Sequence, residues 1–265
     1  MPFSTELVMM VTRGSLRRTN PWLVGFEHSD RVGLRLFCFP YAGGSALVYR
    51  DWHRILPRSI GVQAIQLPGR GDRLAEPPFL DLLALIEPLT EAIKPYLDRP
   101  FAFFGHSMGA LIAFELANKL RREYSVEPAH LFVSGRRAPQ LPDSDSVTYN
   151  LGDREFIEEL RRLNGTPKEM LENPELMQLM GPVLRADFQA CQTYVYTDSP
   201  PLRCPITVFG GLRDNDVTRE CLQPWRNHTS VSFALRLLPG DHFFIHSSEA
   251  ILLRMIAQEL HQLIT

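Results

Sequence analysis

The sequence predicts an α/β protein with a mostly parallel sheet that is flanked by helices on both faces. Short runs rich in Phe, Val, Ile and Leu alternate along the chain with longer segments of helical periodicity, which is typical of such a sheet. The chain has 265 residues, a length that single α/β domains commonly reach, so we expect one core. Hydrophobic residues make up 45% and charged residues 22%, which excludes a largely disordered or fibrous protein.

The expected strands share an apolar composition and a length suited to a buried sheet. They are residues 34–39, 62–67, 101–105, 129–134, 206–210 and 233–238. The expected helices are residues 80–97, with a kink at Pro88, then 108–122, and finally 248–263. The second of these helices is apolar on most of its circumference, so it must be buried.

The alternation breaks between the fourth and fifth expected strands, where we predict a helical lid inserted at about residues 140–200. Thr166-Pro167 and Asn173-Pro174 each combine a helix cap with a first-turn proline, and Gly181-Pro182 should stop and restart the chain. We therefore expect short, broken helices that form a flexible, Met-rich cover for an apolar ligand. The alternative is that these methionines are ordinary core. Residues 1–21 are treated as an N-terminal extension of a domain that covers residues 22–265.

The charge balance gives no support for a polyanionic partner. The formal net charge is −2 and the pI is near 6.5, so we expect no nucleic acid and no membrane surface as partner. The four cysteines are widely spaced and are interpreted as reduced thiols, and no spacing of His, Cys and Asp resembles a metal site. With neither a signal-peptide pattern nor a long apolar run, we expect a soluble cytoplasmic protein without metal or organic cofactor.

A nucleophile elbow is predicted at Gly105-His106-Ser107-Met108-Gly109. This G-x-S-x-G pentapeptide follows an apolar strand and leads directly into an apolar helix, the context that the elbow of an α/β-hydrolase requires. The turn would expose the Ser107 hydroxyl at the carboxyl end of the sheet, where the helix dipole favours developing negative charge. The alternative is a glycine-rich turn that serves only packing.

A serine nucleophile needs a histidine base and an acid that orients it, and in α/β-hydrolases they follow in the order Ser, acid, His. His242 is the preferred base because it follows the last expected strand, and His246 is the rival. Asp214 is the preferred acid because it follows the strand at 206–210, and Asp216 is the rival. His242 as a surface loop residue, or either aspartate as a helix cap, is the non-catalytic alternative.

Acyl transfer also needs two backbone amides that stabilise an oxyanion. The amide of Met108, directly after the nucleophile, supplies the first. The run Pro40-Tyr-Ala-Gly-Gly-Ser45 follows the first strand, and we place the second donor on Ala42, with Tyr41 and Gly43 as neighbours. A plain glycine turn is the alternative.

Several segments together resemble the type II thioesterase family, from about residue 22 onward. They are Pro40-Tyr-Ala-Gly-Gly-Ser45, Leu67-Pro-Gly-Arg70, Gly105-His-Ser-Met-Gly109, Ser134-Gly-Arg-Arg-Ala-Pro139, Leu184-Arg-Ala-Asp-Phe188, Pro224-Trp225 and His242-Phe-Phe244. Two positions depart from the family pattern. Asp241 stands where the family usually has Gly, which leaves the pH optimum open, and Arg70 is followed by Gly71-Asp72 where an acidic residue often comes first.

The resemblance implies an α/β-hydrolase fold with a helical lid. It also implies a serine hydrolase that removes aberrant or stalled acyl groups, or releases product, from carrier-protein phosphopantetheine thiols in polyketide or nonribosomal peptide synthesis. Carried over, the catalytic residues are Ser107, Asp214 and His242, the same that the residues themselves indicate. Alternatives are a medium-chain fatty acyl thioesterase of fatty acid synthesis, a carboxylesterase, and a non-catalytic α/β-hydrolase-fold binding protein.

The expected substrate-binding residues are Tyr41, Met177, Met180 and Phe188, because an apolar acyl chain needs an apolar channel. The expected partner is an acyl or peptidyl carrier protein, bound by a monomer of this chain. Carrier proteins are generally acidic, so basic residues near the lid are candidate contacts, with a solvated charged face as the alternative. These residues are Arg136, Arg137, Arg161, Arg162 and Lys168.

Overall fold

The computed structural model describes residues 20–25, 32–142, 147–166 and 168–263, and these form a seven-stranded sheet in the order β1-β3-β2-β4-β5-β6-β7. The first strand is antiparallel to β3, and every other neighbouring pair is parallel. The α/β class with a mostly parallel sheet is thereby confirmed. The predicted extension lies outside the described residues up to residue 19.

All six expected strands are present, with small shifts at their ends. The strands are β1 (Leu23–Gly25), β2 (Leu34–Phe39), β3 (Ile60–Ile65), β4 (Phe101–His106), β5 (His130–Ser134), β6 (Ile206–Gly211) and β7 (Phe233–Leu238). Strand β3 begins and ends two residues before the predicted range of 62–67. The short edge strand β1 was not predicted.

The expected helices are also present among shorter ones. The α-helices are α1 (Trp52–Ile55), α2 (Leu82–Ile93), α3 (Met108–Tyr124), α4 (Asp153–Leu163), α5 (Lys168–Leu171), α6 (Pro174–Gln192), α7 (Arg219–Leu222), α8 (Phe244–Ser247) and α9 (Glu249–His261). Short 3₁₀-helices are η1 (Ala46–Tyr49), η2 (Gly71–Arg73), η3 (Lys94–Tyr96) and η4 (Gln223–His228). Pro88 lies inside α2, which ends at Ile93 and continues only as η3.

Two apolar clusters fill the space on the two faces of the sheet. Helices α2 and α3 pack on one face with Phe37, Phe103 and Val133 of the strands. Helices α1, α8 and α9 pack on the other with Phe104 and Phe132. The burial of α3 confirms the prediction from its apolar circumference. The sheet is thus packed on both faces, and the loops at its carboxyl edge extend from buried strands.

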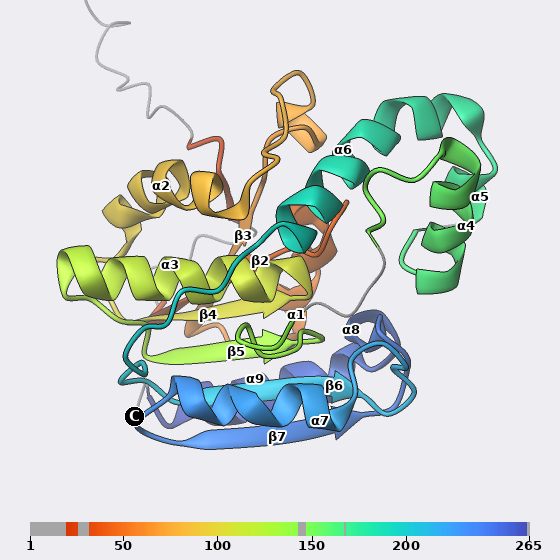
Figure 1. Cartoon of the computed structure of the whole chain (residues 1–265). Helices are drawn as coiled ribbons and strands as arrows, with labels where there is room; N and C mark the ends of the chain where they lie inside the picture. The colour runs from red at the N-terminus through yellow and green to blue at the C-terminus, as the bar shows by residue number, and fades with distance from the viewer. Residues whose placement is uncertain (1–19, 26–31, 143–146, 167, 264–265) are drawn as a thin grey trace, which may run out of the picture.

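Helices α4, α5 and α6 lie between β5 and β6 in the chain and have a small core of their own. We call residues 153–192 the helical insertion. Figure 1 shows the insertion beyond the ends of the strands to which their arrows point. Its core is built from Phe156, Leu160, Leu171 and Leu184, with Met177 and Phe188 packed against it. No helix within the described ranges is long and apolar enough to cross a membrane.

Helix α6 corrects one expectation, because Gly181-Pro182 does not stop the chain. The helix runs unbroken from Pro174 to Gln192 with Pro182 inside it. A proline in a helix loses one hydrogen bond and costs about 3 kcal/mol. Here the half that follows Pro182 buries much of its surface against the domain, and this packing offsets the cost. The predicted start is confirmed, since the Asn173 side chain accepts hydrogen bonds from the amides of Glu175 and Leu176.

Candidate active site

Ser107 lies at a sharp turn between β4 and α3, as the pentapeptide predicts. Its φ of 52° and ψ of −113° are unusual for a residue with a side chain, and its amide donates to the carbonyl of Ser134 at 2.8 Å. A Cβ on Gly105 would lie 2.1 Å from the carbonyl oxygen of Gly109, and one on Gly109 would lie 2.0 Å from that of Phe39. Both glycines are therefore needed for this turn to pack.

His242 and Asp214 meet at the carboxyl ends of β7 and β6. The Nδ1 atom of His242 lies 2.7 Å from Oδ2 of Asp214. The other oxygen of Asp214 accepts the amides of Asp216 and Val217 at 3.0 Å each, and the carboxylate is 1% exposed. Two backbone donors and the imidazole thus fix the orientation of this buried carboxylate.

The two rival residues have other partners. Asp216 directs its carboxylate to the guanidinium of Arg162, 2.8 Å away, rather than to the imidazole. His246 lies in α8 and has its Nε2 atom 3.0 Å from the hydroxyl of Tyr41. Asp241, the departure before the histidine, accepts from the Asn164 side chain and the Phe243 amide. The geometry therefore joins Asp214, and not Asp216, to His242.

The run after β2 forms a tight turn beside Ser107. The Gly44 amide donates to the Tyr41 carbonyl at 2.8 Å, and Gly43 has a φ of +76°, which glycine adopts without strain. The amide of Gly43 donates to Asp187 at 2.7 Å. The hydrogen bonds described for this turn do not use the amide of Ala42, so this amide can donate to a ligand. Met108 is the first residue of α3, so its amide has no partner within the helix.

His106 backs the site from inside the protein. Its ring is fully buried, contacts the rings of His242 and Phe243, and has Nδ1 2.8 Å from the Ser134 hydroxyl. Burial holds the pKa of His106 well below its usual value, so the ring is neutral. Burial also raises the pKa of Tyr41. The imidazole of His242 therefore has a neutral, apolar backing.

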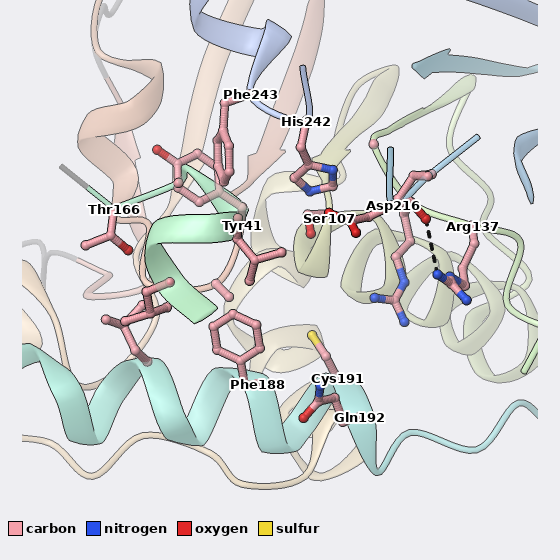
Figure 2. Close-up of a pocket in the computed structure, with 18 residues that line it drawn as sticks. Tyr41, Ser107, Arg137, Thr166, Phe188, Cys191, Gln192, Asp216, His242 and Phe243 are labelled. Atoms are coloured by element: carbon pink, nitrogen blue, oxygen red, sulfur yellow. Dashed lines mark hydrogen bonds between the residues drawn. The ribbon is translucent and has the colours of Figure 1, made fainter. Parts of the chain in front are cut away.

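Five of the predicted site residues line a cavity of about 100 Å³ (Figure 2). Ser107, His242, Tyr41 and Ala42 line it on the side of the sheet, and the insertion closes it opposite. Figure 2 shows the imidazole of His242 next to Ser107, with α6 across the cavity. The side chains from the insertion are Leu160, Leu163, Thr166, Leu184, Phe188, Cys191 and Gln192. The wall is mainly apolar, so it suits an apolar group attached to a carbonyl near Ser107.

The four expected substrate-binding residues divide between three places. Tyr41 and Phe188 line the cavity. Met180 lines an open groove on the other side of Leu184, which Tyr41 and Ala42 border as well. Met177 packs in the core of the insertion and is not among the lining residues described for the cavity or the groove. For Met177, the alternative of ordinary core matches its position.

The basic residues considered as carrier-protein contacts are not one surface. Arg137 is buried and donates to the carbonyls of Pro142 and Asp216, and Arg136 lines the cavity. Arg161 and Lys168 are exposed on the insertion. Arg162 forms ion pairs with Glu159 and Asp216. Arg161 and Lys168 remain suited to contact a partner, whereas Arg137 is not.

Sequence reasoning did not assign a role to Arg70 and Asp187, which the fold brings together. The two terminal guanidinium nitrogens of Arg70 donate to the two carboxylate oxygens of Asp187, at 2.5 and 2.8 Å. Both side chains are almost fully buried. Each residue belongs to a segment that carried the family resemblance, 67–70 and 184–188. Their opposite charges in apolar surroundings were the available signal.

The mostly parallel sheet, the strained serine turn and the Asp214–His242 pair define a protein of the α/β-hydrolase class. The chain belongs to the thioesterase domain family, whose model matches residues 34–260, and within it to the type II thioesterases.

Relatives and solved structures agree with this membership. Linear gramicidin dehydrogenase LgrE of Brevibacillus parabrevis is 49% identical, over 90% of this chain and 92% of LgrE. Gramicidin S biosynthesis protein GrsT of Aneurinibacillus migulanus is 46% identical, over 92% of this chain and 96% of GrsT. The structure of BorB, a type II thioesterase from the borrelidin biosynthetic cluster, is similar with a TM-score of 0.83 and 36% identity, over 90% of this chain and 97% of BorB.

Proposed function

We propose that this thioesterase is a serine hydrolase that removes acyl groups from the phosphopantetheine arm of a carrier protein in nonribosomal peptide or polyketide synthesis. The biosynthetic roles named for GrsT and BorB support this substrate class. The proposed use is the removal of aberrant or stalled acyl groups, or the release of product. The same proposal has the enzyme act in the cytoplasm, as a monomer.

One observation carries the proposal: Asp214 is 2.7 Å from His242, and His242 shares a cavity with Ser107 at a nucleophile elbow. His242 takes the proton of Ser107 as its oxygen attacks the thioester carbonyl. The tetrahedral intermediate expels the pantetheine thiol, which receives the proton from His242. Water activated by His242 then hydrolyses the acyl-serine. Asp214 orients the imidazole throughout.

The oxyanion of each tetrahedral intermediate needs two donors, and this proposal assigns them to the amides of Ala42 and Met108. The Ala42 amide is left over by the turn, and the Met108 amide is at the start of α3, where the helix dipole favours negative charge. Loss of one such donor lowers kcat by about 10²- to 10³-fold in well-studied hydrolases. These backbone groups are therefore a large part of the proposed catalysis.

The insertion acts as the lid over the acyl group in this proposal. A cavity of about 100 Å³ accepts a short acyl chain without rearrangement, given that an apolar cavity of about 150 Å³ holds a benzene molecule. Phe188 and Tyr41 contact the chain, and Met180 borders the groove that adjoins it. Longer acyl groups need the helices of the insertion to shift.

The first test is Ser107→Ala, assayed with an acyl-carrier protein and with a small acyl thioester. Turnover should fall by at least about a thousandfold while thermal unfolding stays close to wild type, because a single exposed hydroxyl leaves no large cavity. A fluorophosphonate should label the wild type and not the variant. Turnover within tenfold of wild type would reject the proposal.

Two other activities are separated by substrate choice. A carboxylesterase would hydrolyse oxygen esters as fast as matched thioesters, and a medium-chain fatty acyl thioesterase would reject acetyl and propionyl thioesters. A binding protein without catalytic activity would hydrolyse neither oxygen esters nor thioesters. The name of LgrE denotes a dehydrogenase. The serine turn and the Asp214–His242 pair support hydrolysis instead.

A further inference from the structure

The strongest unassigned feature is the buried ion pair of Arg70 and Asp187, because it reaches the loop beside Ser107. The side chains of Arg70 and Asp187 are 3% and 5% exposed. Oδ2 of Asp187 accepts a hydrogen bond from Arg70 and, at 2.7 Å, one from the amide of Gly43. Arg70 also donates to the carbonyl of Gly44 at 3.3 Å. One ion pair thus holds the N–H of Gly43 and the carbonyl of Gly44 in the turn that follows Ala42.

The turn is pressed against the insertion as well as bonded to it. A Cβ on Gly43 would lie 2.4 Å from a methyl carbon of Leu184, so α6 rests directly on the backbone there. On its other side the loop is tied to the core, since Gln66 accepts the amide of Ala46 and donates to the carbonyl of Arg70. The contact with α6 is the one that the insertion contributes to this loop.

We propose that Asp187 is a positioning residue that sets the direction of the Ala42 amide by fixing the amide of Gly43. The peptide between Ala42 and Gly43 is held through its N–H, so rotation of that peptide would break the hydrogen bond to Asp187. The Ala42 N–H belongs to the preceding peptide, which is joined to this one at the Cα atom of Ala42. In our proposal, a fixed 42–43 peptide therefore restricts the direction of the Ala42 N–H. This inference rests on the proposed function, in which Ala42 donates to the oxyanion.

Helix α6 then has two duties on neighbouring faces. Leu184 and Phe188, four residues apart, line the acyl cavity. Asp187 faces the core beside Arg70 and Met108. The element that contacts the acyl chain is the element that holds the oxyanion turn, so the insertion contributes to the rate of the chemical step as well as to substrate choice.

Two paired substitutions separate the hydrogen-bond acceptor from the charges. Arg70→Gln with Asp187→Asn removes both charges and keeps an oxygen for the Gly43 amide. Arg70→Met with Asp187→Leu removes both charges and the acceptor, and apolar replacements of buried ion pairs are often neutral or stabilising. With a small acyl thioester, kcat should stay within about fivefold of wild type for the first pair and fall by about 10- to 100-fold for the second. KM should change less than about threefold in both.

A bound-state readout distinguishes positioning from a structural role. An acyl trifluoromethyl ketone forms a tetrahedral adduct with a serine. It should bind the double variant Arg70→Met with Asp187→Leu (the Met/Leu pair) more weakly than wild type, by the same factor as the loss in kcat. A thioether analogue, which forms no adduct, should bind equally to both pairs and wild type. Equal kcat in the two pairs, or equal losses for the ketone and the thioether, would overturn the inference.

Controls keep the result interpretable. Arg185→Gln breaks an ion pair of the same helix with Asp153, inside the insertion, and should leave kcat within about threefold. If the Met/Leu pair does not fold, Asp187→Glu keeps the charge and shifts the carboxylate by one methylene, and it should show the same loss in kcat. An active Ser107→Ala variant would reject the proposed function. An inactive Ser107→Ala together with a fully active Met/Leu pair would reject this inference alone.

Discussion

Nδ1 of His242 faces Oδ2 of Asp214 at 2.7 Å, while the other oxygen of Asp214 is occupied by two backbone amides. The carboxylate is therefore oriented before any substrate binds. Orientation of this kind selects the tautomer in which His242 keeps its proton on Nδ1 and presents Nε2 as the base. The amide of the nearby Asp216 is one of these two donors, but its side chain is directed away from the imidazole, because it is paired with Arg162.

Asp214→Asn should lower kcat by about 10³- to 10⁴-fold, because an amide in this position favours the wrong histidine tautomer. Asp216→Asn is the matched control, since it removes a carboxylate two residues away and loses only the ion pair to Arg162. Steady-state kinetics with one small acyl thioester measure both. The opposite ranking of the two variants would assign the acid to Asp216.

Phe188→Ala should shift acyl preference toward longer chains, because Phe188 lines the cavity and its removal deepens the apolar wall. Each additional buried methylene contributes about 0.8 kcal/mol, or roughly a fourfold gain in kcat/KM. The measurement is the ratio of octanoyl to acetyl kcat/KM.

Met177→Ala is the control for this experiment. It opens space in the core of the insertion, away from the described cavity, and should lower the melting temperature without changing that ratio. A ratio that changes equally in both variants would show that the cavity does not select chain length.

Reversal of charge at Arg161 and Lys168 should raise KM for an acyl-carrier protein, because both cations are exposed on the insertion and carrier proteins are generally acidic. The effect should weaken as salt increases, and KM for a small acyl thioester should not change. Arg203→Glu is a control on the exposed surface outside the insertion. An unchanged KM for the acyl-carrier protein would assign the two residues to a merely solvated face.

Stability should fall as the pH drops below about 6.5, because buried histidines are held neutral. Burial lowers the pKa of His130 and of His228 to about 4 and holds that of His106 well below its usual value. The unfolded chain then binds more protons than the folded one between about pH 6.5 and pH 4, so the free energy of unfolding decreases with falling pH.

The slope is up to about 1.4 kcal/mol per pH unit for each histidine. Urea unfolding of wild type and His130→Gln at several pH values in this window measures it. The variant should lose one histidine's share of the slope. Identical slopes would show that His130 does not contribute to this pH dependence.

Buried parallel strands were predictable because an apolar run bounded by polar residues has few other uses in a soluble α/β chain. The edge strand β1 was not, since three half-buried residues carry no periodicity. The continuity of α6 was missed for a different reason. Proline argues locally against a helix, whereas the burial of Val183, Leu184 and Ala186 that sustains it depends on tertiary contacts.

The residues proposed for the chemistry followed from local sequence, because the elbow, the loop after β6 and the loop after β7 each end a strand. The partnership of Arg70 and Asp187 joins positions 117 residues apart, and no local pattern reports such a distance. Met177 shows the same limit in reverse. Helical spacing places it on an apolar face, but only the packed structure shows that it lies against the core of the insertion and is not among the residues described as lining the cavity.

Pro182 divides α6 into a second half that is largely buried against the domain and a first half, residues 174–180, without a fully buried side chain. The missing amide weakens the helix at that point, and nothing lies within 4 Å of where a Cβ on Gly181 would stand. The two residues of α6 that hold the turn beside Ser107, Leu184 and Asp187, both come after the proline. Residues 168–180 are therefore the segment to exchange with that of a relative, and we expect the exchange to alter the groove bordered by Met180 and to leave the turn beside Ser107 in place.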